Sequence, residues 1–161
     1  MTVQTHNAAP AGHDAGLQLV ADLLGGSKVL RHRLNSSLDA HEMLLQGIPG
    51  AALMHLAEHL AVLRKSASFE KAVGMSLRTM QRRKEAPAKL LSQEQSGRTW
   101  KFAEILARAT VVLGSQEEAE QWLERPAMGL DQRRPIDLLA TPAGVEIVQD
   151  FLGRLEYGVY T

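Results

Sequence analysis

The pattern of apolar positions is most regular between residues 92 and 114. Ser92 followed by Gln95 is typical of a capping box, which marks the start of a helix. Gly114 is suited to end that helix, because glycine adopts the left-handed conformation at a helix C-terminus without strain. The segment is predicted to be the best amphipathic helix of the chain, with these residues on its buried face: Phe102, Ile105, Leu106, Ala109, Val112 and Leu113.

Similar signals predict helices on both sides of this one. Leucines at helical spacing predict a helix over residues 49–64, and a second capping box predicts one over 115–123. Apolar stretches within 17–47 are consistent with short helices. Thr141 and the proline after it begin a last helix with an apolar face of Val145, Val148, Leu152 and Leu155. No pair of alternating strands with a hairpin turn is found, so an all-α fold is predicted.

The N-terminal segment and the composition indicate a cytoplasmic protein. Residues 1–16 lack apolar periodicity and are expected to form a disordered or loosely attached tail. They also lack the basic and apolar regions of a secretory signal, and no run is long enough to span a membrane. The chain has no cysteine, which excludes disulfides and thiolate metal sites.

Two short helices joined at a glycine are predicted over residues 68–86. Ser68 is expected to cap the first helix, and Gly74 to end it. Ser76 is expected to cap the second helix, which stops before Pro87. This arrangement is the outline of a helix-turn-helix.

The second of these helices has the residue types of a DNA recognition helix. Met75 and Met80 can seat it on the protein, whereas polar residues at helical spacing can face bases and phosphates: Ser76, Arg78, Gln81 and Arg82, extended by Arg83 and Lys84. The alternative interpretation is a surface helix of an ordinary bundle. Two positions depart from the usual pattern, since Glu70 stands where a small residue is common and Arg83 where an apolar one is common.

Charge is segregated along the chain although the formal net charge is zero. Residues 64–89 hold eight Lys/Arg and two Asp/Glu, a net of +6, and residues 115–161 hold four Arg and nine Asp/Glu, a net of −5. The first segment is suited to meet phosphates and the second to meet a basic partner. The alternative for either segment is a solvated charged face.

His55, Glu58 and His59 form the one sequence pattern that resembles a metal hydrolase. Two histidines four apart on a helix can share a metal ion. However, no third ligand with a partner motif is found, and the three residues lie opposite the leucine face of their helix. No phosphate loop or nucleophile elbow is present either. We therefore predict no catalytic residue, metal or cofactor, and interpret the chain as not an enzyme.

Five stretches taken together resemble the Xre/MbcA/ParS antitoxin family, from about Gly47 to the C-terminus. They are GMSLRTMQRRK, LLSQEQSGRTWKFAEILARA, EEAEQWLERPAMGL, PIDLLATPAGVEIV and FLGRLEYGVY. The resemblance implies an Xre-like helix-turn-helix DNA-binding domain, expected over residues 17–90, followed by a helical toxin-binding domain over 91–161. It also implies a partner, a RES-domain toxin that consumes NAD⁺, whose active site the C-terminal helix and tail cover. Homodimers would bind their own promoter and repress it.

Residue by residue, the resemblance places the recognition-helix motif on Ser76, Arg78, Thr79, Gln81, Arg82 and Arg83, and the terminal motif on Gly153, Arg154, Glu156, Tyr157, Gly158 and Val159. With Lys84 added for its charge, and Leu152 and Tyr160 added as apolar anchors, two candidate sites follow. The DNA-binding residues are expected to be Ser76, Arg78, Thr79, Gln81, Arg82, Arg83 and Lys84. The toxin-binding residues are expected to be Leu152, Arg154, Glu156, Tyr157, Gly158, Val159 and Tyr160. The chain departs from the family at residues 131–134, which read Asp-Gln-Arg-Arg where the family often has a glycine pair.

Two other functions remain open at this point. One is a helix-turn-helix transcription factor whose C-terminal domain senses a small ligand, in which case a metabolite would copurify with the protein. The other is a metal hydrolase built on His55 and His59, which would require stoichiometric zinc.

Overall fold

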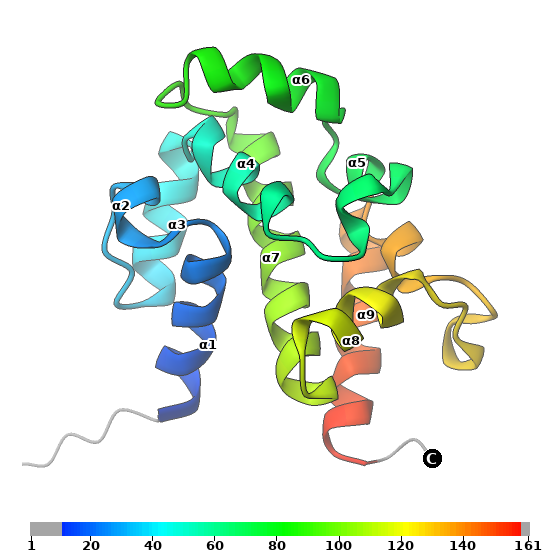
Figure 1. Ribbon diagram of the computed structural model, residues 1–161. Coiled ribbons are helices and arrows are strands. Elements are labelled where there is room, and N and C mark those ends of the chain that lie inside the picture. The colour runs from blue at the N-terminus through cyan, green and yellow to red at the C-terminus, as the bar shows by residue number, and fades with distance from the viewer. Residues whose placement is uncertain (1–10, 159–161) are drawn as a thin grey trace, which may run out of the picture.

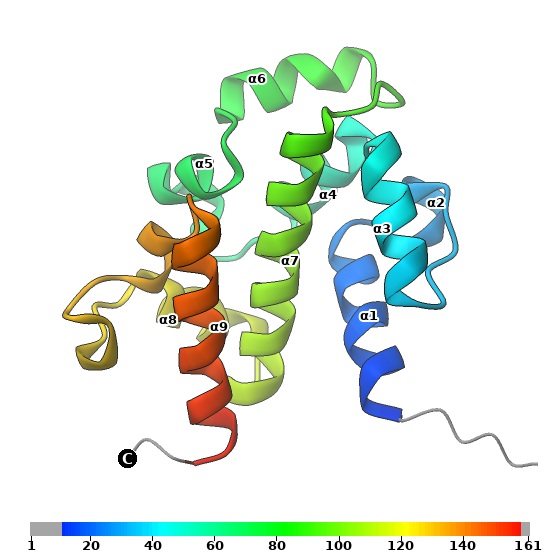
Figure 2. The same ribbon diagram turned by 180° about the vertical axis from the view of Figure 1, so that it is seen from behind.

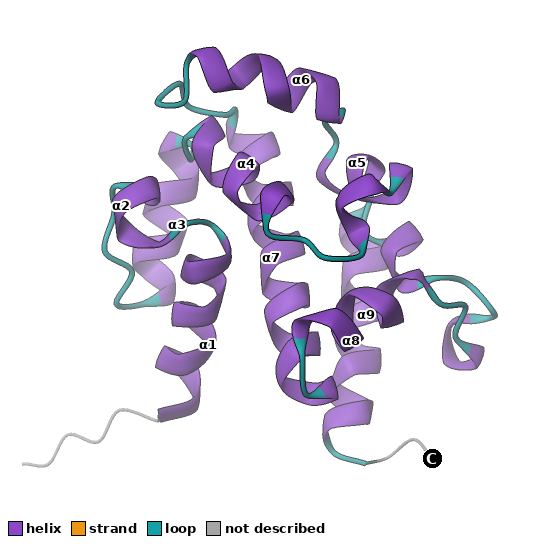
Figure 3. Cartoon of the chain, in the orientation of Figure 1, coloured by secondary structure: helices purple, strands orange, loops and turns teal. Residues whose placement is uncertain are grey.

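The computed structural model describes residues 11–158, and it consists of helices joined by short loops (Figure 3). These residues contain no strand, and their extended pairings are two isolated bridges, Pro49 with Leu90 and Ala127 with Arg133. The predicted all-α fold is confirmed. The α-helices are α1 (Ala11–Leu23), α2 (Gly26–Leu30), α3 (Ser37–Gln46), α4 (Gly50–Glu58), α5 (Ala67–Val73), α6 (Leu77–Arg82), α7 (Gln93–Leu113), α8 (Gln116–Glu124) and α9 (Pro142–Glu156). The 3₁₀ helices are η1 (Leu63–Lys65), η2 (Arg83–Glu85), η3 (Met128–Leu130) and η4 (Pro135–Leu138).

Helix α7 runs through the middle of the molecule and contacts α1, α3, α5, α8 and α9 (Figures 1 and 2). Its limits are those predicted from the sequence. The Ser92 hydroxyl accepts a hydrogen bond from the Gln95 N–H at 3.1 Å, and Gly114 ends the helix in the left-handed conformation with φ 101°. With 21 residues, α7 is about 30 Å long and can carry elements of both halves of the chain.

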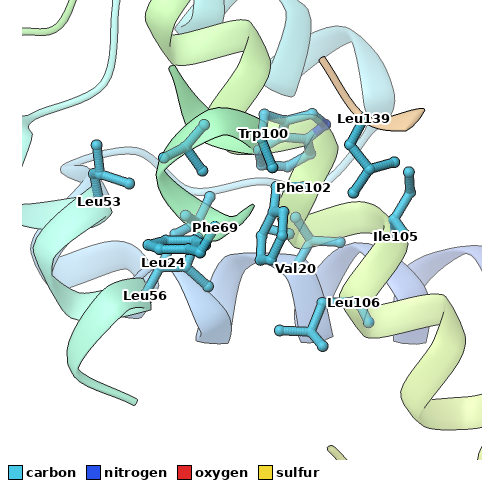
Figure 4. Packing of buried hydrophobic residues seen from close by; sticks show 14 of the residues in the cluster. Val20, Leu24, Leu53, Leu56, Phe69, Trp100, Phe102, Ile105, Leu106 and Leu139 are labelled. Atoms are coloured by element: carbon cyan, nitrogen blue, oxygen red, sulfur yellow. The ribbon is translucent and has the colours of Figure 1, made fainter. Parts of the chain in front are cut away.

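The buried residues form one cluster that extends from α1 to α9. Figure 4 shows side chains from α1, α4, α5 and α7 meeting in it, with Leu139 beside Ile105. Phe69 of α5 meets Phe102 of α7 edge to face, with ring centroids 5.1 Å apart. Because the cluster includes residues before and after α7, the two halves of the chain share a single core.

The N-terminal segment differs from the expected tail. Helix α1 begins at Ala11, so residues 11–16 are helical, and residues 1–10 lie outside the described part of the chain. Val20, Ala21 and Leu24 are buried, and α1 packs along α7. These residues lie at offsets of one and four, which is the spacing of one helical face. The apolar positions that pack α1 onto the core therefore all follow residue 16, whereas the helix itself begins within the polar segment that suggested disorder.

Helix α4 is shorter than the predicted helix over 49–64, because it ends at Glu58. The backbone N–H groups of residues 61, 62 and 63 donate to the carboxylate of Glu120 on α8 instead of to helical carbonyls. A long-range contact therefore ends this helix, and no local residue signals it.

Candidate functional site

The turn between α5 and α6 has the geometry of a helix-turn-helix. Gly74 is left-handed with φ 73°, and its N–H donates to the Glu70 carbonyl at 2.8 Å. The Ser76 hydroxyl caps α6 by accepting from the Thr79 N–H at 3.1 Å, as predicted. The prediction for Ser68 was wrong, because α5 begins two residues earlier than expected and its cap is Ser66. Ser68 is instead buried inside α5, at the contact with η4.

Helix α6 lies at one end of the molecule, above α4 and the start of α7 (Figure 1). Met80 is buried beneath it, and Met75 and Leu77 are partly buried against the core, so the predicted seating of the helix is confirmed. Most of the predicted DNA-binding side chains are exposed: Ser76, Arg78, Thr79, Gln81, Arg82 and Lys84. The exposed residues of this list are called the α6 face below.

Arg83 and Lys84 are less free than the rest of the predicted set. Arg83 is half-buried, its aliphatic stem lies close to Gly50, and its Nε is buried without a hydrogen-bond partner. Lys84 Nζ pairs with Glu58 Oε1 at 2.9 Å. The hydrogen bond from Lys84 favours the charged carboxylate and so lowers the pKa of the Glu58 carboxyl below its ordinary value.

Side chains from α7 hold the C-terminal end of α5. Arg98 Nη2 donates to the carbonyls of Lys71 at 2.6 Å and Ala72 at 3.2 Å, and Gln95 donates to the carbonyl of Val73. These are carbonyls that a helix end leaves without partners of its own. The Arg98 guanidinium occupies the space that a side chain at Gly74 would need. The turn before α6 is therefore fixed both by its glycine and by α7.

Glu120 of α8 is fully buried, with 0% of its surface exposed, and it holds the loop after α4. Its carboxylate accepts the N–H groups of Ala61 at 3.0 Å, Val62 at 2.9 Å and Leu63 at 3.0 Å, and the side-chain amide of Gln116 at 3.0 Å. Four donors compensate for removing this carboxylate from water. The contact ties α8 to the segment that leads into α5.

A second connection runs from η4 to α5. Arg134 donates to both carboxylate oxygens of Asp137, at 2.8 and 2.9 Å, and to the Ser68 hydroxyl at 2.8 Å. The hydrogen bond to Asp137 raises the pKa of the Arg134 guanidinium further above its already high value. Arg134 therefore stays charged and joins the loop before α9 to the buried side of α5.

The predicted toxin-binding residues separate into three groups. Leu152 is fully buried in the core, so its assignment to an exposed binding surface is corrected, since it packs α9 onto the protein. Arg154, Glu156, Tyr157 and Gly158 are exposed at the end of α9. The last two predicted residues, Val159 and Tyr160, lie outside the described residues.

The end of α9 forms an open hollow of about 540 Å³ against α7. Arg108 of α7 crosses it, donating to the Gln149 carbonyl at 3.3 Å and pairing with Glu156 at 3.3 Å. Tyr157 also lines the hollow and is 80% exposed. Acidic side chains are exposed over the rest of this half: Glu117, Glu118, Asp131, Asp137, Glu146 and Asp150. The predicted acidic surface is present, with Glu120 excluded from it by burial.

The loop that contains η3 has the conformation of a glycine turn without glycine at the key positions. Asp131 and Gln132 have φ values of 52° and 62°, in the left-handed region. The Gln132 N–H donates to the Ala127 carbonyl at 2.9 Å, and the Ala127 N–H donates to the Arg133 carbonyl at 3.1 Å. This is the place where the sequence departs from the family pattern of a glycine pair.

The histidine pattern on α4 does not form a metal site. His55 and His59 stack with ring centroids 4.0 Å apart, and their Nδ1 atoms contact the backbone carbonyls of Leu23 and His55. Glu58 is engaged with Lys84. Within residues 11–158 no group of three or more potential ligands is placed to hold a metal ion. In the same part of the chain, no helix has both the length and the apolar composition needed to cross a membrane.

Two family models match the chain, one over its N-terminal part and one over its C-terminal part. Residues 39–104 match the antitoxin Xre-like helix-turn-helix domain, and residues 108–158 match the antitoxin Xre/MbcA/ParS C-terminal toxin-binding domain. A Yersinia enterocolitica protein named Antitoxin Xre is 32% identical over 104 residues, which are 64% of this chain and 70% of that relative. The chain belongs to the Xre/MbcA/ParS antitoxin family.

Other members of the family cover different shares of the chain. An Antitoxin Xre from Photorhabdus laumondii is 31% identical over 87 residues, 53% of this chain and 58% of that relative. One from Pseudomonas putida is 28% identical over 125 residues, 78% of this chain and 76% of that relative. As an antitoxin of this family, the chain has a DNA-binding and a toxin-binding domain and is not an enzyme. The family resemblance found in the sequence is confirmed.

The boundary between the two family matches falls inside α7, at residues 105–107, and not between residues 90 and 91 as expected. In this antitoxin, α7 supplies Arg98 to the helix-turn-helix and Arg108 to the hollow at the end of α9. Sequence reasoning missed Arg98, Glu120 and Arg134 as positioning residues, because their partners lie at least 26 residues away.

Proposed function

We propose that this antitoxin neutralises a RES-domain toxin that degrades NAD⁺, by covering the active site of the toxin with the end of α9 and the tail that follows it. An acidic, exposed surface suits a cleft that binds the phosphates of a dinucleotide, because such a cleft is lined by basic groups. Arg154, Glu156, Tyr157 and Gly158 are the described residues assigned to this contact, with Val159 and Tyr160 beyond them. Tyr157 supplies apolar area of the kind that anchors interfaces.

We further propose that the antitoxin binds its own promoter as a homodimer and represses it in the cytoplasm. Two copies would place their α6 faces in half-sites about one DNA turn apart. Arg78, Gln81 and Arg82 would approach the bases, while Ser76, Thr79, Arg83 and Lys84 would bind phosphates or position the helix.

One observation carries both proposals. The α6 face and the end of α9 lie at opposite ends of the molecule in both views (Figures 1 and 2). The first is basic, and the second belongs to a surface rich in carboxylates. DNA and a toxin can therefore be bound at the same time without competing for space.

Two variants of the full chain test the division of roles. Arg82→Ala should weaken operator binding about tenfold or more, because a base or phosphate contact is lost, and should leave toxin neutralisation intact. Deletion of residues 156–161 should do the reverse. Gel-shift titration with promoter DNA and NAD⁺ content of cells that express the toxin measure the two activities.

Arg33→Ala is the matched control for Arg82→Ala, because Arg33 is also exposed but belongs to the loop before α3 and not to the predicted DNA-binding set. It should change operator affinity less than twofold. If cells with the tail deletion remain fully protected, the proposed covering of the active site is wrong. If no gene next to that of the antitoxin encodes a RES-domain protein, the proposed identity of the toxin is wrong.

One observation favours the alternative, a transcription factor that senses a ligand. A groove of about 750 Å³ lies between α5, α7 and the start of α9, with Phe102, Ile105 and Leu139 on its floor and Arg98 and Lys101 at its rim. This volume lies in the range of small-molecule sites. Mass spectrometry of the protein purified under native conditions tests it, since a stoichiometric metabolite supports a sensor and a copurifying toxin supports the antitoxin.

A further inference from the structure

Met128 is a large apolar side chain that is 84% exposed, in the loop between α8 and η4. Isolated exposed apolar residues are common on protein surfaces and need no function. Met128 differs from such residues in how the loop around it is built.

The residues that flank Met128 are fixed to the protein. Leu130 is buried, and Gly129 lies so close to Phe151 of α9 that a Cβ at this position would be 2.5 Å from the ring. The hydrogen bonds between residues 127 and 132 and between 127 and 133 close the loop behind them. The backbone therefore holds Met128 on the outside of the loop, while Leu130 stays buried.

The loop keeps this conformation at a cost. Asp131 and Gln132 both occupy the left-handed region. This backbone conformation is less favourable for a residue that has a Cβ atom than it is for glycine. Asp is one of the residues that tolerate the region, but Gln has no such advantage. Backbone strain of this kind persists only where the surrounding structure holds it in place, and it is concentrated at functional sites.

The loop packs against α9, the helix whose end carries the predicted toxin contact. Phe151, which contacts Gly129, stacks on Trp122 of α8 with ring centroids 5.9 Å apart. Tyr157 lies six residues further along α9, about 9 Å along the helix axis. All of these residues fall within the span 108–158 that matches the toxin-binding domain.

We propose that Met128 is a second anchor for the toxin, inserting into an apolar recess on the toxin surface outside the NAD⁺ site. This inference rests on the proposed function, because it takes the toxin as the partner. A thioether side chain suits this role, since it is unbranched and adapts to the shape of the recess that receives it. The rigid loop lowers the entropic cost of binding, because the anchor is already held in place. Contacts at Met128 and at the end of α9 would then grip the toxin at two separate points.

The test measures the affinity of the full-length antitoxin for the RES-domain protein encoded beside it, made inactive by substitution so that it can be produced alone. Met128→Ala should raise the dissociation constant about fivefold or more in calorimetric titrations, as expected for the loss of an anchor residue. Leu38→Ala is the matched control, because Leu38 is 63% exposed on α3, outside the toxin-binding match. It should change the affinity less than twofold.

A second measurement does not depend on a variant. The ε-methyl resonance of Met128 in the labelled antitoxin should shift or broaden when the toxin is added, because the methyl group leaves water. Circular dichroism should show the Met128→Ala protein folded like the parent, since the side chain is exposed.

The outcomes separate this inference from the proposed function. If Tyr157→Ala weakens binding and Met128→Ala does not, the second anchor is wrong and the proposed function stands. If both variants bind like the parent, the contact surface assigned to the end of α9 is wrong as well. If the parent chain does not bind the RES-domain protein, the proposed function itself is overturned.

Discussion

The α5–α6 unit and the α8–α9 pair are held in place by different kinds of contact. Around α5–α6, polar side chains reach in from later parts of the chain: Arg98 from α7, Glu120 from α8 and Arg134 from the segment before η4. Around α8–α9 the contacts are mainly apolar, with Trp122 stacked on Phe151 and other side chains fully buried against α7. Hydrogen bonds depend on direction, so the first kind of contact fixes the orientation of a unit as well as its position.

This difference indicates that the DNA-binding half is not independent of the toxin-binding half. Two of the three polar side chains, Glu120 and Arg134, lie within the toxin-binding match, yet their partners lie in the helix-turn-helix match. The shared core leads to the same conclusion. We therefore expect the chain to unfold as a single cooperative unit, and the following predictions test the comparison.

The largest effect is expected for Glu120→Ala. This change leaves the N–H groups of residues 61–63 without partners, so the free energy of unfolding should fall by about 3–5 kcal/mol. Glu120→Gln should lower the free energy of unfolding less, because the amide oxygen can still accept hydrogen bonds from these N–H groups. Urea denaturation monitored by circular dichroism measures both.

Leu123→Ala on the same helix is the control for Glu120→Ala. Leu123 is fully buried in the apolar contact, so the loss of stability should be comparable, about 2–5 kcal/mol. At a temperature where both variants are folded, Glu120→Ala should weaken operator binding and Leu123→Ala should not. Equal operator affinity in the two variants would contradict the proposed positioning role of Glu120.

The next effect is expected for Gly74→Ala, which should lower the free energy of unfolding by about 2 kcal/mol. The left-handed conformation is unfavourable for alanine, and the new methyl group displaces the Arg98 guanidinium. Gly97→Ala is the control, because Gly97 lies inside α7 with open space around it. It should leave stability unchanged or raise it by up to about 1 kcal/mol. A Gly74 variant as stable as the parent would show that the turn is not fixed as described.

A smaller effect of opposite sign is expected for Gln132→Gly. Glycine adopts the left-handed conformation without strain, which stabilises the folded state, but its greater freedom in the unfolded chain offsets part of this gain. The free energy of unfolding should therefore rise by about 0.5–1 kcal/mol. Arg133→Gly, one position further along at an ordinary φ, should lower it by a similar amount. Thermal denaturation of the two variants should therefore shift in opposite directions, and a shift in the same direction would refute the strain at Gln132.

The smallest effect concerns the ion pair between Glu58 and Lys84. The pKa of the Glu58 carboxyl is lowered in the folded protein, so the pair stabilises the fold above the pKa of the unfolded chain, and this stabilisation is lost as the pH falls through the folded pKa. Both side chains are exposed, so the contribution should stay below about 1 kcal/mol. NMR titration should show the pKa of Glu58 returning toward its ordinary value in Lys84→Met. An unchanged pKa would contradict the pairing.

Features set by neighbouring residues could be predicted from the sequence. The caps at Ser76, Ser92, Ser115 and Thr141 and the left-handed Gly74 depend on contacts within four residues, and each is present. The cap of α5 was assigned to the wrong serine because Ser66 and Ser68 offer the same hydroxyl group. The exposure of the α6 face followed from helical spacing alone, although its contact with DNA remains a prediction.

Features set by distant residues could not be predicted. The early end of α4 depends on Glu120, which is 57–59 residues away in sequence. Leu152 was assigned to an exposed surface as an apolar anchor beside the terminal motif, but its place on the apolar face of α9 buries it. The loop around Met128 keeps a glycine-like backbone through Asp131 and Gln132, and no local pattern of residue types indicates that conformation.

The length of α7 constrains how the chain can tolerate insertions. One extra residue in the middle of a helix turns everything beyond it by about 100° and advances it by about 1.5 Å. An insertion between Arg98 and Arg108 would therefore rotate Glu120 of α8 and Arg134 away from the loop and the serine that they now contact. The connection between α8 and η3 is not helical, so an extra residue there would not turn the following elements by a fixed angle. Chimeras that join the first half of one relative to the second half of another should keep the residue count of α7 unchanged, or alter it by nearly whole turns.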